Sequence, residues 1–170
     1  MLFSILCWIY ATECMEVIPE RANVVYMNPK YVYTNATVNV RRYGRKSRYY
    51  INVEGVTKHT WTNNMTFTLV VTQLLHNEYR PSFVELKYKL CDLINKEPFV
   101  GECLKHVGVV CPLPAGYHNI MNITANTENF PSVFPFEHGR IEVLLSLTDT
   151  KEHAFMFHIV ATFKQKPKGK

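Results

Sequence analysis

Residues 83–90 read Phe-Val-Glu-Leu-Lys-Tyr-Lys-Leu, the clearest indication of fold in this chain. Apolar and charged side chains alternate along the stretch: Val84, Leu86, Tyr88 and Leu90 against Glu85, Lys87 and Lys89. Successive side chains of a β-strand point to opposite faces of the sheet. The stretch therefore predicts a strand with one face in a core and the other in water.

The same period of two recurs along the chain. It predicts strands at residues 31–40, 48–53, 64–75, 83–90, 117–125, 141–147 and 153–164, separated by turn signals rich in Gly, Pro and Asn. A short helix is compatible only with residues 90–96 or 101–110. Seven or so short strands predict an all-β, antiparallel two-sheet sandwich or β-cup of immunoglobulin-like type. The inward residues suit an apolar inter-sheet cavity and a solid core equally well.

The chain has 170 residues, of which 47% are hydrophobic. A chain of this length buries enough surface to fold without a metal or dense disulfides, and no apolar run is long enough to span a bilayer as a helix. We expect a single domain at residues 14–163. A signal peptide at residues 1–13 precedes it in this interpretation, and a flexible Lys-rich tail at residues 164–170 follows it.

The first residues, MLFSILCWIYATEC, combine an apolar run with small and polar residues. This pattern is typical of a secretory signal, although its start carries no positive charge. A buried first strand or helix is the alternative. We expect cleavage between residues 11 and 14 and a secreted, extracellular protein.

Three Asn-X-Thr sequences are acceptors for N-glycosylation if the chain is secreted: those at Asn35, Asn64 and Asn122. Alternation places all three on the polar side of their predicted strands. Within residues 117–125, Tyr117, Met121 and Ile123 are expected to face inward, so that Asn122 faces out.

Five cysteines are present, and removal of Cys7 with the signal leaves an even set: Cys14, Cys91, Cys103 and Cys111. An even set suits two disulfides in an oxidising compartment. Cys103 with Cys111 is the easiest local closure, with Cys14 to Cys91 as its complement. Sequence alone does not choose among the three connectivities, and a single disulfide with buried thiols is the alternative.

Catalytic motifs are poorly represented in the sequence. It has no G-x-S-x-G, no Gly-rich phosphate loop and no H-E-x-x-H, and its seven His are scattered. Cys103, His106 and Cys111 could be drawn as a metal cluster, but secretory signals favour a disulfide. We predict a protein that is not an enzyme and has no cofactor or metal.

The positive charge is concentrated in one run: Arg41, Arg42, Arg45, Lys46 and Arg48. Without this run and the four lysines at the C-terminus, 10 basic residues face 14 acidic ones. The run predicts contact with an anionic surface, such as lipid headgroups or sulfated glycans, and no nucleic acid partner is expected for a secreted chain. A convertase site and a solvated turn are the alternatives.

Six short features occur in a recognisable order: Tyr50-Ile-Asn-Val-Glu-Gly55, Asn77-Glu-Tyr-Arg-Pro81, Lys89-Leu-Cys-Asp-Leu93, Cys111-Pro-Leu-Pro-Ala-Gly-Tyr117, the pair Pro131 and Pro135, and His138-Gly-Arg-Ile141. Over roughly two-thirds of its length the chain resembles the secreted arthropod family that includes the CheA-type chemosensory proteins. That family is similar to the ML lipid-recognition superfamily, which contains the ganglioside activator and sterol carriers.

The resemblance implies a β-sandwich or β-cup that holds an apolar ligand between its sheets without catalysis. It also implies that Cys91, Cys103 and Cys111 are structural half-cystines and that Pro112, Pro114 and Gly116 shape the loop after Cys111. The basic run at residues 41–48 and the short signal depart from the family's pattern.

Together these features predict a secreted binding protein for a lipid, fatty acid or hydrocarbon-like pheromone, acting in chemosensation or lipid transport. Strand parity selects the candidate pocket residues: Phe67, Leu69, Val71, Leu86, Tyr88, Met121, Ile123, Leu145, Phe155 and Phe157. The alternative is an extracellular interaction module that modulates a membrane receptor or channel without a lipid. An inter-sheet void below about 300 Å³, the low end for ligand pockets, favours this alternative.

Overall fold

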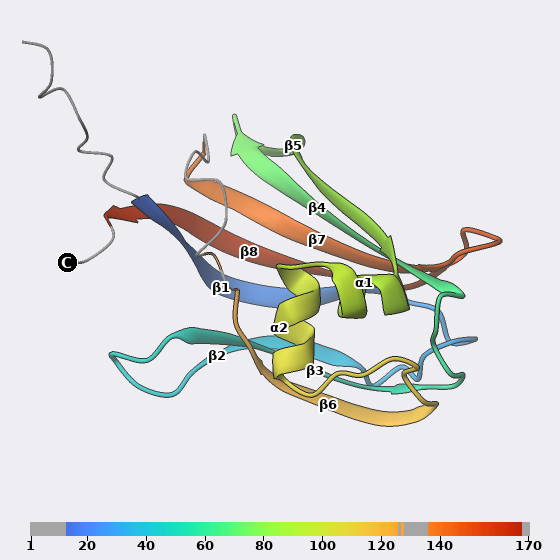
Figure 1. Cartoon of the computed structure of the whole chain (residues 1–170). Coiled ribbons are helices and arrows are strands. Elements are labelled where there is room, and N and C mark those ends of the chain that lie inside the picture. The colour runs from blue at the N-terminus through green and yellow to red at the C-terminus, as the bar shows by residue number, and fades with distance from the viewer. Residues whose placement is uncertain (1–12, 126, 128–135, 168–170) are drawn as a thin grey trace, which may run out of the picture.

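The computed structural model describes residues 13–125, 127 and 136–167 and shows a two-sheet antiparallel sandwich, as the alternation predicts. One sheet has the order β1-β8-β7-β4-β5 and the other the order β2-β3-β6. Figure 1 shows the two sheets as stacked layers. The strands are β1 Glu13–Met27, β2 Thr37–Arg42, β3 Tyr49–Thr57, β4 Met65–Leu75, β5 Glu78–Lys89, β6 Gly116–Ile123, β7 His138–Leu147 and β8 His153–Pro167.

Two short helices, α1 (Leu90–Lys96) and α2 (Val100–His106), lie between β5 and β6 along the chain. The helix predicted at residues 90–96 is confirmed, whereas in the candidate at residues 101–110 the helix ends at His106. The helices lie at the side of the sandwich where the edge strands β5 and β6 run (Figure 1). They pack so closely that a Cβ on Gly101 of α2 would lie 1.9 Å from the backbone oxygen of Leu93 in α1. Along the opposite side, edge strand β1 contacts β2.

Strand β1 was not predicted, and its irregular register explains the omission. Its pairing with β8 shifts at Pro19/Arg21 and again at Val24/Tyr26, and each shift interrupts the alternation of side chains. The same pairing corrects the expected start of the tail at residue 164, because β8 continues to Pro167 opposite Glu13. The proposed signal lies outside the described residues except for Glu13, which begins β1.

Several predicted boundaries differ from the structure. Strand β7 begins at His138 and not at residue 141, and β6 ends at Ile123 and not at residue 125. Strand β2 begins only at Thr37, because residues 33–35 form an exposed turn after Val32. Glu54-Gly55 lies inside β3, where the glycine allows close approach: a Cβ there would lie 3.1 Å from the Cβ of Ala36. Arg80-Pro81 lies inside β5, and the hairpin turn is His76-Asn77, whose φ angles of 50° and 64° suit a tight β-hairpin.

The apolar core consists of two clusters. The larger fills the space between the sheets and under the helices and includes Phe67, Leu93 and Phe155. The smaller gathers around Met15 and Phe163. Of the helices in the described part of the chain, none combines the length and apolarity needed to cross a bilayer.

Candidate functional site: an apolar cavity between the sheets

A cavity of about 150 Å³ lies within the larger core cluster. Its wall is almost entirely apolar and draws on both sheets, both helices and the loops that join them. Close-packed protein interiors rarely leave a void larger than a water molecule. A void of this size is therefore the feature of the described structure that most resembles a binding site.

The large sheet supplies one wall as rows of side chains across three strands. Phe67 of β4 pairs with Leu145 of β7, which in turn pairs with Phe155 of β8. In the next row Val143 of β7 pairs with Phe157 of β8. All five line the cavity because every second residue of each strand faces inward.

The small sheet supplies the facing wall through Val53 of β3 and Ile120 and Ile123 of β6. A bulge sets this arrangement: Val53 pairs with Ile120 but Ile51 pairs with Ile123, so β6 contains one extra residue. Within it, Asn122 has a φ of 63°, and its backbone N–H donates to Asn52 Oδ1 at 2.8 Å. The bulge turns both isoleucines inward.

The helices close the side of the cavity with three apolar residues: Leu90 and Ile94 of α1 and Leu104 of α2. The parity of residues 83–90 already predicted an inward Leu90. Ile94 follows it by one helical turn on the same face, a spacing that could have identified it within the expected helix.

Four cavity residues carry polar side-chain atoms: Glu54, Thr57, Trp61 and His118. The Glu54 carboxylate accepts a hydrogen bond from the Tyr117 hydroxyl at 2.9 Å. His118 Nε2 lies 2.8 Å from the backbone oxygen of Pro114 and 3.2 Å from Thr57 Oγ1. Trp61 is only 6% exposed, and its indole Nε1 is buried with no hydrogen-bond partner among the residues that the structure describes. Because this nitrogen is buried from the cavity as well as from bulk solvent, Trp61 contributes apolar ring surface to the wall and presents no donor to a ligand.

Half of the predicted pocket residues line the cavity: Phe67, Ile123, Leu145, Phe155 and Phe157. Leu69 and Leu86 pack against the core without lining the cavity, and Val71 belongs to the smaller cluster. The inward positions predicted for Tyr88 and Met121 are wrong, because each is 37% exposed. Tyr117 is also outward, at 61% exposed, because the bulge reverses the expected phase of β6.

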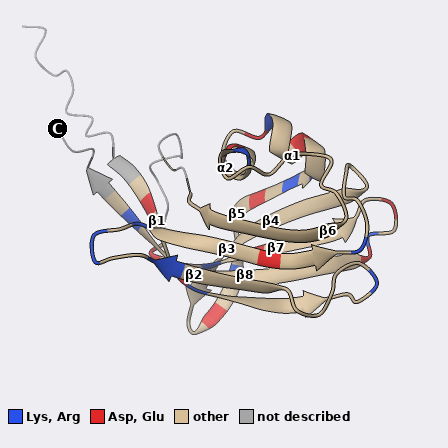
Figure 2. Cartoon of the chain, turned by 90° about the horizontal axis from the view of Figure 1, so that it is seen from below, with Lys and Arg blue, Asp and Glu red and all other residues tan. Residues whose placement is uncertain are grey.

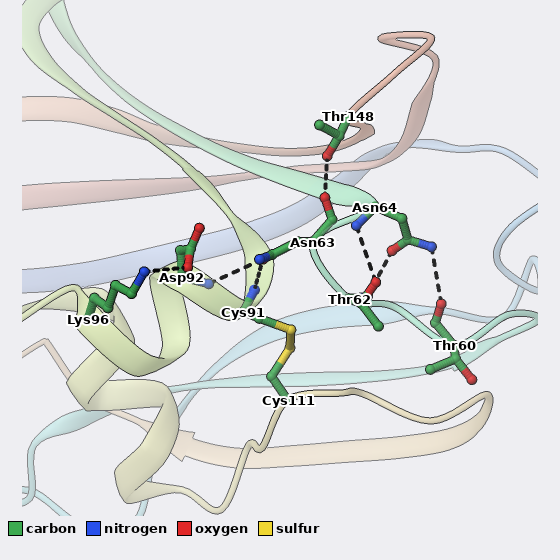
Figure 3. The surroundings of a disulfide bond; sticks show 9 residues. All are labelled: Thr60, Thr62, Asn63, Asn64, Cys91, Asp92, Lys96, Cys111 and Thr148. Carbon is green, nitrogen blue, oxygen red and sulfur yellow. Dashed lines mark hydrogen bonds and ion pairs between the residues drawn. A yellow bond between two sulfur atoms is a disulfide. The ribbon is translucent and has the colours of Figure 1, made fainter.

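The structure pairs Cys91 with Cys111, so the predicted local closure of Cys103 with Cys111 is wrong. Cys91 is the second residue of α1, and the bond joins this helix to the loop before β6, with the two Cα atoms 5.3 Å apart. Figure 3 shows Asn63 beside it, where its Oδ1 accepts hydrogen bonds from the backbone N–H groups of Cys91 and Asp92. The side chain of Cys14 lies outside the described residues.

The disulfide also excludes the metal cluster considered in the sequence, because Cys111 is bonded to another cysteine and has no thiolate that could bind a metal. Among the described residues, no group of three or more His, Cys, Asp or Glu could hold a metal ion. On the outer face of the large sheet, His158 lies 4.0 Å from Glu142. Burial, together with the charge of Arg140, lowers the pKa of His158, which is therefore neutral at pH 7.

The basic run forms the end of β2 and the loop to β3, where Figure 2 shows Lys and Arg. Its five cations are exposed, and none forms an ion pair with a carboxylate of the described residues. Arg42 stacks over Tyr49, with its Cζ 4.9 Å from the ring centroid, and donates to the backbone oxygen of Ser47. The loop thus carries a concentrated and uncompensated positive charge.

The acceptor residues Asn35, Asn64 and Asn122 are all exposed, as their parity predicted. They differ in their hydrogen bonds. Asn64 lies in the turn before β4, where its Oδ1 accepts from Thr62 N at 2.7 Å and its Nδ2 donates to the Thr60 backbone oxygen (Figure 3). The Oδ1 of Asn122 accepts from the Tyr43 hydroxyl at 2.8 Å.

Comparison with known proteins does not assign a function to these sites. The sequence matches no protein-family model, and no curated protein matches it significantly.

Proposed function

We propose that this protein is a secreted carrier that binds a small apolar ligand, or one thin apolar group of a larger ligand, in the cavity between its sheets. The observation that carries the proposal is an apolar void of about 150 Å³ inside an otherwise packed core. Transfer of apolar surface from water into such a space contributes roughly 25 cal/mol per Å². The resemblance to the CheA-type and ML families, based on short ordered motifs, supports the same function.

The volume narrows the expected ligand. Pockets for drug-sized molecules begin at about 300 Å³, whereas an apolar cavity of about 150 Å³ is known to bind a benzene-sized molecule. The ligand that fits the present cavity is therefore close to benzene in size. A fatty acid or long hydrocarbon would place only part of its chain there.

Leu145→Phe is expected to abolish binding of toluene, because the larger side chain projects into the cavity. In the unchanged protein, toluene at about 100 times its Kd stabilises the fold by about 2.7 kcal/mol, which raises Tm by about 5–10 °C. Differential scanning calorimetry with and without toluene measures this shift.

Leu144→Phe is the matched control, because Leu144 is the preceding residue of β7, lies on the outer face of the sheet and does not line the cavity. It should keep the full shift. Ile120→Phe, from the facing wall, should lose the shift as Leu145→Phe does. If toluene leaves the Tm of the unchanged protein in place, or if Leu145→Phe and Ile120→Phe both keep the shift, the carrier proposal fails.

The second candidate function is an extracellular interaction module. The cavity is smaller than pockets for drug-sized molecules, so its volume favours this function over a carrier of such a molecule. Its contact surface would be the basic loop of Arg41, Arg42, Arg45, Lys46 and Arg48, whose charge suits an anionic partner such as lipid headgroups on a membrane that holds a receptor or channel. Failure of toluene binding together with salt-dependent binding to phosphatidylserine vesicles would replace the carrier by this function.

A further inference from the structure

An open groove of about 590 Å³ lies on the surface at the end of the sandwich where the basic loop begins. Three elements form it: the hairpin of β2 and β3 through Tyr43 and Tyr50, the end of β6 through Met121, and the end of α2 through His106. Figure 1 shows the end of β6 beside α2. The groove is separate from the inter-sheet cavity and shares no lining residue with it.

The groove contains an acceptor sequence for an N-linked glycan. Asn122 and Thr124, the first and third residues of one acceptor sequence, both line it. Glycan attachment uses the Nδ2 atom of asparagine, and the Tyr43 hydroxyl donates to the other amide atom, Oδ1, at 2.8 Å. The hydrogen bond therefore orients the amide without consuming the nitrogen that carries a glycan.

The backbone holds this asparagine outward. Asn122 is the extra residue of the β6 bulge, with a φ of 63° that Asn tolerates better than most residues, and its N–H is held by the buried Asn52. Its side chain is therefore presented from a hydrogen-bonded strand rather than from a loop. Asn64, by contrast, uses both amide atoms inside a turn.

The wall of the groove suits a sugar. Tyr43 is 58% exposed, and its ring centroid lies 5.4 Å from that of Tyr50. A pyranose ring has an apolar face of C–H groups and a polar rim of hydroxyls, so it gains from contact with aromatic rings. Arg48 and His106 supply polar atoms around the rings.

We infer that Asn122 carries an N-linked glycan whose first N-acetylglucosamine residues lie in this groove against Tyr43 and stabilise the fold. The glycans of Asn35 and Asn64, where attached, make no such contact. The inference rests on the proposed carrier function only in that both require the protein to pass through the secretory pathway. The glycan test does not depend on whether the cavity binds a ligand.

The test compares Thr124→Ala with Thr124→Ser in protein secreted from insect cells. Both variants keep Asn122 and its bond to Tyr43, but only serine keeps the acceptor sequence. Mass spectrometry of glycopeptides should find a glycan on Asn122 in the unchanged protein and in Thr124→Ser, and none in Thr124→Ala. Thr124→Ala should melt about 2–4 °C below Thr124→Ser, the shift expected for one aromatic contact.

Tyr43→Ala shows whether the aromatic contact is responsible. In that background the difference in Tm between Thr124→Ala and Thr124→Ser should fall below about 1 °C. Thr37→Ala removes the acceptor sequence of Asn35, which does not line this groove, and should leave Tm within about 1 °C. A secreted protein without a glycan on Asn122, equal Tm values for the two Thr124 variants, or a difference that survives Tyr43→Ala would each overturn the inference, while toluene binding would be unaffected.

Discussion

Phe155→Ala is expected to lower the free energy of unfolding by about 3–5 kcal/mol, a large part of the 5–15 kcal/mol of a typical domain. Phe155 is 5% exposed on an interior strand of the large sheet, and its ring lies 5.7 Å from that of Phe157. Truncation removes buried apolar surface and enlarges a void that the surrounding side chains already leave open. Urea denaturation, followed by circular dichroism, measures the loss.

Met156→Ala is the matched control for this prediction. Met156 is the next residue of β8, faces the outer side of the same sheet and is only half-buried. It should lose clearly less stability than Phe155→Ala. Toluene should restore more stability to Phe155→Ala than to Met156→Ala, because the larger cavity can take more of it. Equal losses in the two variants would contradict the placement of Phe155 in the cavity wall.

Replacing both Cys91 and Cys111 by serine is expected to lower the free energy of unfolding by about 3 kcal/mol. The bond spans 20 residues of sequence, and a loop of that length gives about this figure in the chain-entropy account. The loop contains both helices, so its release also loosens the side of the cavity formed by Leu104. Urea denaturation under non-reducing conditions measures the loss, and toluene titration should show weaker binding.

Cys103→Ser keeps the Cys91–Cys111 bond and is the matched control for the disulfide. It should lose much less stability than the double variant, and it should keep its toluene affinity. Reduction of the unchanged protein by dithiothreitol should reproduce the double variant. A loss that is as large in Cys103→Ser, or a double variant as stable as the unchanged protein, would contradict this account of how the helices are held.

Alternation predicted those strands whose side chains keep one phase from end to end. In β8, Phe155, Phe157, Ile159, Ala161 and Phe163 are all buried, as the pattern of residues 153–164 indicated. The same reasoning failed at β6, where one bulge residue reversed the phase of Tyr117 and Met121. It also missed β1, which changes register twice. Local periodicity cannot locate a bulge, because a bulge is defined by the partner strand.

The candidate site shows the same difference between what alternation predicts and what it misses. Strand parity identified five cavity residues, because an inward side chain in the middle of a strand must contact the space between the sheets: Phe67, Leu145, Phe155, Phe157 and Ile123. Trp61, by contrast, lies in the connection before β4 and bridges Leu113 through backbone hydrogen bonds, a contact across 52 positions of sequence. No local pattern marks such a residue as part of a cavity wall.

The sequence by itself determined that this chain is an antiparallel β-sandwich, because the period of two in its apolar residues needs no knowledge of distant partners. It also determined the exposed acceptor asparagines and the local concentration of positive charge. Only the tertiary structure decided that Cys91 bonds Cys111, that Asn122 and Tyr43 share a groove and that an apolar cavity of about 150 Å³ lies between the sheets. These features depend on how well side chains from separate elements fill the space between them, and that fit arises only when the sheets and helices pack.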